Sequence, residues 1–479
     1  MHRNILKAFS TAVIAVLPGC MSMSGISTTA QPKDTAQLEA GHDISEARHD
    51  LPWPGEAWWQ VFQDPQLDAL VNHSLQQHPD IRAARSRTAI AEAQAQAAGA
   101  LLAPQASANG TLMRERFTSL QFIPPPWAGH TEWNNKATLN LGYDLDLWGQ
   151  RAQQWQSALD RTQATAAEAQ QVKLSLTTAL VMQYIALSRA HALHDITHHR
   201  LDIAHQQLDI RKRALAAGLG TEIEVTEAES LIPALRAQLE AGDERITLLR
   251  QQLAALAGEG PGYAERLHPP KLSLDADIGL PDALPANLVG RRPDIVAAKW
   301  RIEAARHNIA SAKAAFYPNI NLLGFVGLQA MGFGKILTES GMVAGVGPAL
   351  SLPLFDGGLR RGNLAATTAD YDLAVEQYNS ILLQSLQEIS AQLVTLRSNA
   401  IQHAELLDAL RLAQRSKKLA LTHHQAGLAN YLQVLDAEHH VLTQHAALVD
   451  LEASRLSAYA DLMKALGGGA GQPPSGLHQ

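Results

Sequence analysis

Few residues of the sequence have the type and spacing that metal or redox chemistry requires. Cys20 is the single cysteine, so the chain forms neither an intrachain disulfide nor a cysteine-rich metal site. Histidines occur in adjacent pairs at positions 198–199, 423–424 and 439–440. Adjacent residues of a helix point to different faces, whereas two helical ligands of one metal ion usually lie one turn apart. The pairs therefore predict solvated surface histidines and no metal site.

Motifs of the common enzyme classes are also missing from the sequence. We find no phosphate-binding glycine loop before a helix, no metalloprotease helix motif and no nucleophile elbow. Charged residues make up 18% of the chain, and the net charge is −7 without a basic run. A nucleic-acid-binding surface needs a cationic face. We therefore predict neither an enzyme nor a nucleic-acid-binding protein.

Two carboxylates stand near the starts of predicted helices. Asp436 follows Leu432 by four residues, so both side chains lie on one helix face. Glu224 closes the run Thr221-x-x-Glu224, a capping box that stabilises the first turn of a helix. The residue types leave two interpretations open for each acid, a helix-stabilising residue near the positive helix end or part of a functional site.

The elements that position these residues occur twice in the chain. The run His78-Pro79-Asp80-Ile81 matches Arg292-Pro293-Asp294-Ile295 at a shift of 214 residues. Gly218-Leu219 and the residues that follow match Gly427-Leu428 and its followers at a shift of 209. Matches that keep their order and nearly their spacing indicate an internal duplication.

Each half contains an unusually long predicted helix. Residues 150–217 and 363–426 hold neither glycine nor proline over 68 and 64 residues. At about 1.5 Å per residue, each would be about 95–100 Å long. A glycine turn follows each, and a second helix, 221–257 in the first half, folds back. With a shorter helix at 81–103, this predicts a rod of antiparallel helices made twice.

Segments with a period of two lie between the short and the long helices. They are residues 105–122 and 136–148 in the first half, and 319–330 and 341–355 in the second. Residues 136–148 and 341–355 have one apolar and one polar face, and the alternation in 105–122 and 319–330 is weaker. The pattern is typical of a membrane β-barrel with a wet interior, although a soluble β-sandwich is an alternative. Four strands are too few to close a barrel, so several copies of the chain must share it.

The N-terminus has the layout of a secretory signal. Residues 1–19 combine basic Arg3 and Lys7 with an apolar stretch, and Leu17-Pro18-Gly19-Cys20 resembles a bacterial lipobox. We expect Cys20 to carry a covalent lipid, the only cofactor predicted, and residues 20–50 to form a tether. Met21 stands where aspartate would retain a lipoprotein in the inner membrane, so the outer membrane is expected. An ordinary signal peptide with an incidental cysteine is the alternative.

The doubled Pro-Asp helix start, the run Leu-Pro-Leu-Phe-Asp-Gly-Gly at 352–358 and Tyr-Leu-Gln-Val-Leu-Asp-Ala at 431–437 together resemble the TolC-like outer-membrane efflux proteins. The lipoprotein branch of the OprM and NodT type is the nearest. The resemblance covers residues 55–467. It implies a mainly α fold with a membrane β part: a homotrimer in which each chain gives four strands to one outer-membrane barrel above a hollow helical cylinder in the periplasm.

The resemblance also implies a function. Such proteins are passive exit ducts of tripartite efflux systems that expel small molecules such as drugs, with a periplasmic adaptor and an inner-membrane pump, here expected to be proton-driven. Leu432 and Asp436 would form rings at the closed periplasmic aperture, and Glu224 matches a gate acid of the first half. The adaptor would dock at the helical hairpin tips, which are Gly218, Leu219, Gly220, Gly427 and Leu428.

The predicted organisation is a signal peptide, a tether, two repeats with a connector between them, and a tail. The signal peptide is 1–19 and the tether 20–50. The repeats are 51–257 and 291–466, the connector is 258–290, and the tail is 467–479. Two other functions remain open at this point: an exit duct for secreted polypeptides, and a coiled-coil spacer lipoprotein without a pore. The spacer would have no use for paired alternating strands at matched places in both halves.

Overall fold

The computed structural model describes residues 22–34, 38, 44, 53–120, 122–272 and 290–469. The predicted signal peptide, Cys20, most of the tether, connector residues 273–289 and tail residues 470–479 lie outside these described residues. The chain divides into two compact units. Unit 1 comprises residues 1–32, 87–165 and 298–378, and unit 2 comprises 33–86, 166–297 and 379–479.

Two pairs of helices of equal length confirm the duplication. Helices α5 (Gln150–Ala216) and α9 (Leu359–Gln425) have 67 residues each. Helices α6 (Glu222–Leu256) and α10 (Tyr431–Ala465) have 35 residues each. The prediction placed the start of α9 four residues too late, because it treated Gly362 as a helix boundary. One glycine inside a helix costs only about 1 kcal/mol, which a helix of this length tolerates.

The shorter helices begin at the repeated motif. Helices α4 (Pro79–Ala100) and α8 (Pro293–Ala314) have 22 residues each and start at its proline. The proline fixes φ at a helical value and lacks the N–H that the first turn would leave unpaired. Helix α3 (Pro65–Gln77) also starts at a proline, and its N-cap Asp64 accepts hydrogen bonds from the backbone of Gln66 and Leu67.

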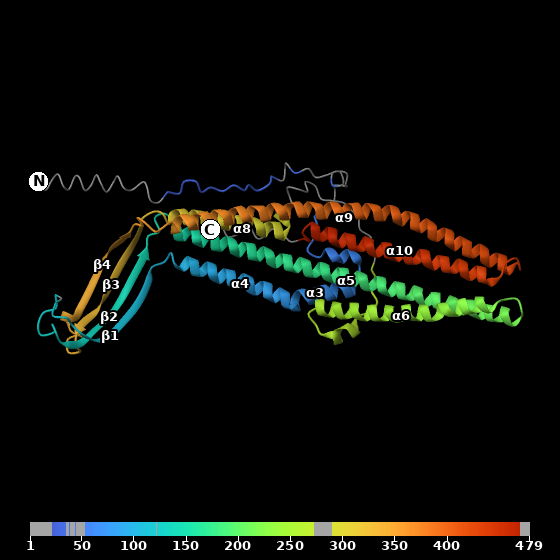
Figure 1. Ribbon diagram of the computed structural model, residues 1–479, viewed down its shortest axis with the longest axis horizontal. Helices are drawn as coiled ribbons and strands as arrows, with labels where there is room; N and C mark the ends of the chain where they lie inside the picture. The colour runs from blue at the N-terminus through green and yellow to red at the C-terminus, as the bar shows by residue number, and fades with distance from the viewer. Residues whose placement is uncertain are drawn as a thin grey trace. The chain divides into compact units, whose positions relative to one another are not determined.

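The four strands form one antiparallel sheet in chain order (Figure 1). They are β1 (Gln105–Arg116), β2 (Thr131–Asp144), β3 (Asn319–Met331) and β4 (Met342–Ser351). All four were predicted, but β2 starts five residues earlier and β1 ends six residues earlier than expected. Strand β4 ends at Ser351, two residues before Pro353. Since β2 pairs with β3, the sheet joins the two halves of the chain.

One face of the sheet presents exposed apolar side chains. Leu139 on β2 stands opposite Val326 on β3, which in turn stands opposite Ala344 on β4. Leu139, Leu141, Val326, Val346 and Leu350 are all exposed. Side chains alternate between the two faces along a strand, so Asn140 and Thr138 lie on the opposite face. This is the alternation predicted from the sequence.

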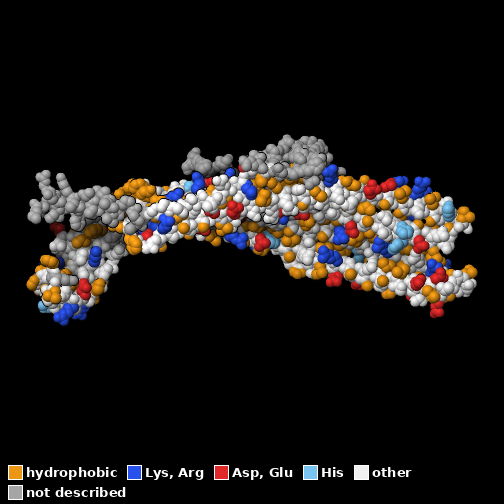
Figure 2. Space-filling view, turned by 45° about the horizontal axis from the view of Figure 1, so that its top comes forward, with side chains coloured by type: hydrophobic (Ala, Val, Ile, Leu, Met, Phe, Trp, Pro, Cys, Tyr) orange, Lys and Arg blue, Asp and Glu red, His pale blue; other side chains and the backbone are white. Residues whose placement is uncertain are grey.

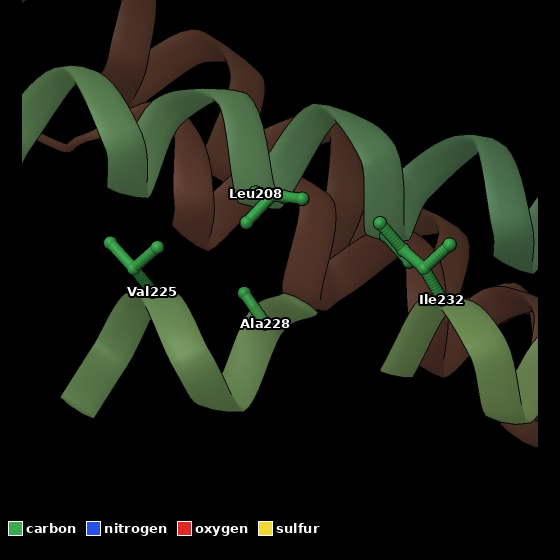
Figure 3. Close-up of a cluster of buried hydrophobic side chains, with 5 residues drawn as sticks. Leu208, Val225, Ala228 and Ile232 are labelled. Carbon is green, nitrogen blue, oxygen red and sulfur yellow. The ribbon is translucent and has the colours of Figure 1, made fainter. Parts of the chain in front are cut away.

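Small and branched apolar residues pack the α5–α6 hairpin in unit 2. Ala204 and Leu208 of α5 form a buried cluster with Val225, Ala228 and Ile232 of α6. Figure 3 shows Leu208 of α5 facing Val225 and Ala228 of α6. The small side chains of Ala204 and Ala228 let the helix backbones approach closely. Packing of this kind provides most of the stability of long helices in water.

Polar contacts tie the described part of the connector to α3. The hydroxyl of Tyr184 donates a hydrogen bond to Asp64 at 2.9 Å, and the backbone N–H of Lys271 donates to the same carboxylate at 2.9 Å. The backbone N–H of His268 donates to Gln66 at 2.9 Å. Buried Asp64 thus fixes the start of α3 to α5 and to residues 267–272.

The helices have mixed surfaces. Figure 2 shows basic and acidic side chains interspersed with apolar ones on the face in view. Within the described part of the chain, no helix is both long and apolar enough to cross a membrane.

Candidate functional site: the helical hairpin ends

Both hairpins reverse through the same glycine turn. Gly218 and Gly427 have φ of 70° and 72°, the left-handed region that only glycine adopts at little cost. In the first turn, the N–H of Leu219 donates to the carbonyl of Ala214 at 2.8 Å. In the second, the N–H of Leu428 donates to the carbonyl of His423 at 2.9 Å. This double use of a Schellman-type helix end explains why glycine recurs at these positions.

The hairpin tips expose one leucine each. Leu219 is 85% exposed and Leu428 is 77% exposed. They follow the two turn glycines at equivalent repeat positions. Gly220 has no left-handed backbone, but a side chain there would approach the backbone of Leu215 to 3.2 Å. The five tip residues singled out from the sequence therefore lie at the hairpin ends, three on the first tip and two on the second.

Glu224 is occupied by contacts within its own hairpin. Its carboxylate accepts a hydrogen bond from the backbone N–H of Thr221 at 3.0 Å, which completes the predicted capping box. It also forms an ion pair with Arg211 of α5 at 2.6 Å. The Thr221 backbone N–H, followed by the charge of Arg211, lowers the pKa of Glu224. These contacts favour the helix-stabilising interpretation of this acid.

Asp436 has a different environment. It is exposed on α10, and its carboxylate accepts a hydrogen bond from the side-chain amide of Gln207 on α5 at 3.0 Å. Leu432, one turn earlier, is half-buried. Among the described residues, no ion pair involves Asp436, and no hydrogen bond joins it to Glu224. The structure thus places Leu432 and Asp436 on one helix and leaves the carboxylate of Asp436 uncompensated by a cation.

The repeat supplies counterparts for both acids. At the shift of 209, Leu432 corresponds to Ile223, Asp436 to Glu227, and Gln433 to Glu224. Ile223 and Glu227 are both exposed near the start of α6. The counterpart of Asp436 is therefore Glu227 and not Glu224.

Sequence reasoning missed the basic partners at the hairpins. Lys212 pairs with Glu229 at 3.3 Å, and Lys417 pairs with Glu438 at 2.7 Å. Glu229 and Glu438 are themselves equivalent at the shift of 209, so the recurrence was visible in the sequence. Lys212 and Lys417 are not at equivalent repeat positions, so nothing in the sequence marked them as partners. The same holds for Arg211, which pairs with Glu224, and for Gln207, which donates to Asp436.

The histidine pairs take part in local contacts. Nδ1 of His424 lies 3.0 Å from the carbonyl oxygen of Ala429, and the His424 ring packs near Tyr431. Burial, followed by the nearby charge of Arg200, lowers the pKa of His439. Among the described residues, no three histidine, cysteine, aspartate or glutamate side chains form a group able to hold a metal ion.

Comparison with known proteins identifies the family. The family model described as outer membrane efflux protein matches residues 70–259 and 284–468. The fusaric acid resistance protein FusA of Burkholderia cepacia is 41% identical over 365 residues, 75% of this chain and 68% of FusA. The multidrug resistance outer membrane protein MdtP of Escherichia coli K12 is 30% identical over 465 residues, 95% of this chain and 94% of MdtP.

A solved structure agrees with these relatives. The outer membrane protein VceC of Vibrio cholerae shares 32% identity and a TM-score of 0.80, over 88% of this chain and all of that chain. The predicted fold class, long antiparallel helices made twice with four strands per chain, is confirmed. The chain belongs to the outer membrane efflux protein family and is an outer-membrane efflux channel protein.

Proposed function

We propose that this chain forms the trimeric exit duct of a tripartite efflux system, with β1–β4 of three copies closing one barrel in the outer membrane. One observation supports this most strongly: the sheet has an exposed apolar face and two open edges, β1 and β4. An open edge has unpaired backbone groups that lipid cannot satisfy, so the sheet must pair with other copies. The repeats 51–257 and 291–466, joined by connector 258–290, would each supply two strands and the long helices.

The hairpin tips are the proposed docking site for a periplasmic adaptor, which connects the duct to a proton-driven pump in the inner membrane. The exposed Leu219 and Leu428 support this, because apolar side chains at a loop tip favour a protein partner over water. Small molecules such as drugs are the proposed substrates. The relatives' names, multidrug resistance and fusaric acid resistance, support that class. The duct itself would be passive and without catalysis.

Leu432 and Asp436 are the proposed aperture residues. Three copies of Asp436 around an axis would place like charges near one another, and such a ring restricts anions and attracts cations. The absence of a cationic partner for Asp436 among the described residues supports this role. Glu224 is the weaker member of the proposed gate, because its charge is already paired with Arg211.

We also propose an outer-membrane lipid anchor at Cys20, with the helices in the periplasm of a Gram-negative bacterium. The described part of the tether supports this by its contacts within unit 1. Arg361 donates hydrogen bonds to the carbonyls of Ser22 and Ser24, and Asp372 accepts from the backbone and hydroxyl of Thr29. The segment that follows Cys20 is thus held along α9.

Planar-bilayer conductance of the purified trimer tests the duct. We expect small currents from the unmodified protein and a several-fold larger conductance after Leu432→Ala with Asp436→Ala, because both changes widen the aperture. Glu452→Ala is the matched control, since it removes an exposed acid of α10 about four turns away and should change nothing. A double variant that never conducts, or a purified protein that stays a single subunit, would refute the duct and favour a spacer.

A further inference from the structure

The polar face of the sheet has an ordered set of side chains. On β2 it carries Asn134, Lys136, Thr138 and Asn140. The amide of Asn140 donates to the hydroxyl of Thr138 at 3.4 Å, and the amide of Asn134 donates to Glu115 at 2.7 Å, so these side chains share one face. The opposite face carries the exposed Leu139, Leu141, Val326 and Val346. In a membrane barrel the apolar face contacts lipid, and the polar face lines the lumen.

Lys136 is the cation on this polar face. The strand register places it opposite Thr111 of β1 and Gln329 of β3, both uncharged. Lys136 is exposed, and among the described residues its ammonium has neither an ion pair nor a hydrogen bond. Its positive charge is therefore uncompensated by the strands on either side.

The acids on the same face are too far along the strands to cancel this charge. Glu132 and Glu115 lie opposite each other four residues away, roughly 13 Å at about 3.3 Å per residue. This exceeds the Debye length of about 8 Å at physiological ionic strength. At the other end of β2, Asp144 is already paired with Arg151 at 2.6 Å. The level of Lys136 thus has a positive local potential.

Apolar side chains lie on the same face between Lys136 and the end of β2 that leads into α5. Phe325 stands opposite Asn140 on the polar face, and its ring lies against Gly345, where an added Cβ would be only 2.7 Å away. Leu323, two residues along β3, lies against Gly142. Gly345 leaves room for the Phe325 ring, because a side chain at this position would collide with it. The face therefore presents a cation and, roughly 13 Å away, exposed apolar surface.

We infer that three copies of Lys136 form an anion-attracting ring in the barrel lumen, and that with Phe325 this ring favours the passage of organic anions with an apolar body. The positive ring complements a carboxylate, and the Phe325 and Leu323 side chains complement the apolar part of the same molecule. This inference rests on the proposed trimeric barrel. It adds a charge selectivity within the barrel that is separate from the aperture at the hairpins.

Reversal potentials across planar bilayers test the ring. The channel is measured in the Leu432→Ala, Asp436→Ala background, so that the proposed aperture contributes no acid ring. In a potassium chloride gradient around 0.1 M, Lys136→Gln should lower the chloride-to-potassium permeability ratio about threefold, since three charges about one Debye length away still act on a passing ion. Lys136→Arg should keep the ratio, and Lys136→Glu should lower it further than Lys136→Gln does, because three negative charges repel chloride and attract potassium.

The matched control is Arg114→Gln. Arg114 is exposed on β1 opposite Trp133, on the face that would contact lipid. Arg114→Gln therefore removes one positive charge per chain from outside the lumen and should leave the permeability ratio unchanged. With benzoate in place of chloride, Phe325→Ala should lower the benzoate permeability relative to chloride.

The outcomes separate the two proposals. A background channel that never conducts refutes the duct itself. A channel that conducts with the same permeability ratio in Lys136→Gln as in its parent overturns the ring while leaving the duct intact. A selectivity that persists unchanged at 1 M salt also overturns it, because the Debye length is then only about 3 Å.

Discussion

Replacing Arg292 by methionine should destabilise unit 2 strongly, because this arginine joins three helices through charges that lie largely out of water. Its side chain is 8% exposed. The guanidinium binds Asp294 through two hydrogen bonds at 2.7 and 3.1 Å and pairs with Glu388 of α9 at 2.8 Å. It also donates to the carbonyl of Ala465, the last residue of α10, at 3.1 Å.

The expected loss follows from what the substitution leaves behind. Removing one partner of a buried ion pair typically costs about 3–5 kcal/mol, because the other charge stays without compensation. Asp294 and Glu388 are partly exposed, so water reaches both after the change. We therefore take the lower end, about 3 kcal/mol. For a cooperative unit of this size, that corresponds to a fall in the melting temperature of about 6 °C.

Thermal unfolding of the detergent-solubilised protein, followed by circular dichroism, measures this loss. Arg306→Met is the matched control, because Arg306 is 64% exposed and its pair with Glu303 is a surface contact worth less than about 1 kcal/mol. Arg292→Lys should fall between the two, since an ammonium keeps the charge but cannot bind Asp294 through two parallel bonds. Equal melting temperatures for Arg292→Met and Arg306→Met would refute the reasoning.

Three further outcomes are expected. Glu224→Gln should speed hydrogen exchange at the hairpin less than Glu224→Ala, since glutamine loses the pair with Arg211 but still completes a capping box; equal exchange in the two variants would exclude a capping role. Gly218→Ala or Gly427→Ala should lower stability by about 1 kcal/mol through left-handed strain, measurable as a lower melting temperature than for Gly55→Ala. Burial raises the pKa of Asp160, so the stability of the folded state should fall as pH rises through that pKa. Asp160→Asn should remove this fall when melting temperatures are measured between about pH 4 and 7.5. The same pH dependence in the variant and the unmodified protein would contradict this.

The long helices and their turns could be predicted because their signals are local. An uninterrupted run without glycine or proline, followed by Gly218 or Gly427, defines the end of each long helix to within one residue and the start of α5 at the residue observed, whereas α9 starts four residues earlier than its run. Strand bounds were less accurate, because pairing with a neighbour decides them. Thr131 belongs to β2 since Arg116 of β1 lies opposite it, a fact of register that no local period contains.

At the candidate site, too, local contacts could be predicted and contacts between separate helices could not. The capping box at Glu224 was visible because its two members are three residues apart in sequence. Its ion pair with Arg211, and the hydrogen bond from Gln207 to Asp436, join residues on separate helices. Such contacts depend on how α5 packs against α6 and α10, which periodicity does not determine. Even so, the repeat register alone assigns Glu227 as the counterpart of Asp436.

The two hairpins are duplicates that are not equally stabilised, and this difference predicts which hairpin end opens more readily. In the first, Arg211 and Glu224 form an ion pair between α5 and α6. At the shift of 209 their positions hold Ala420 and Gln433, which cannot form one.

The second hairpin, which carries Leu432 and Asp436, therefore has less to hold its end closed, and regions with fewer contacts open at lower free energy. Restoring the pair with Ala420→Arg and Gln433→Glu should make the second hairpin end exchange its amide hydrogens more slowly and shorten channel openings in planar bilayers. Ala420→Arg alone is the control, since it adds the charge without its partner. A double variant that opens as often as this control would show that the missing ion pair does not govern the proposed aperture.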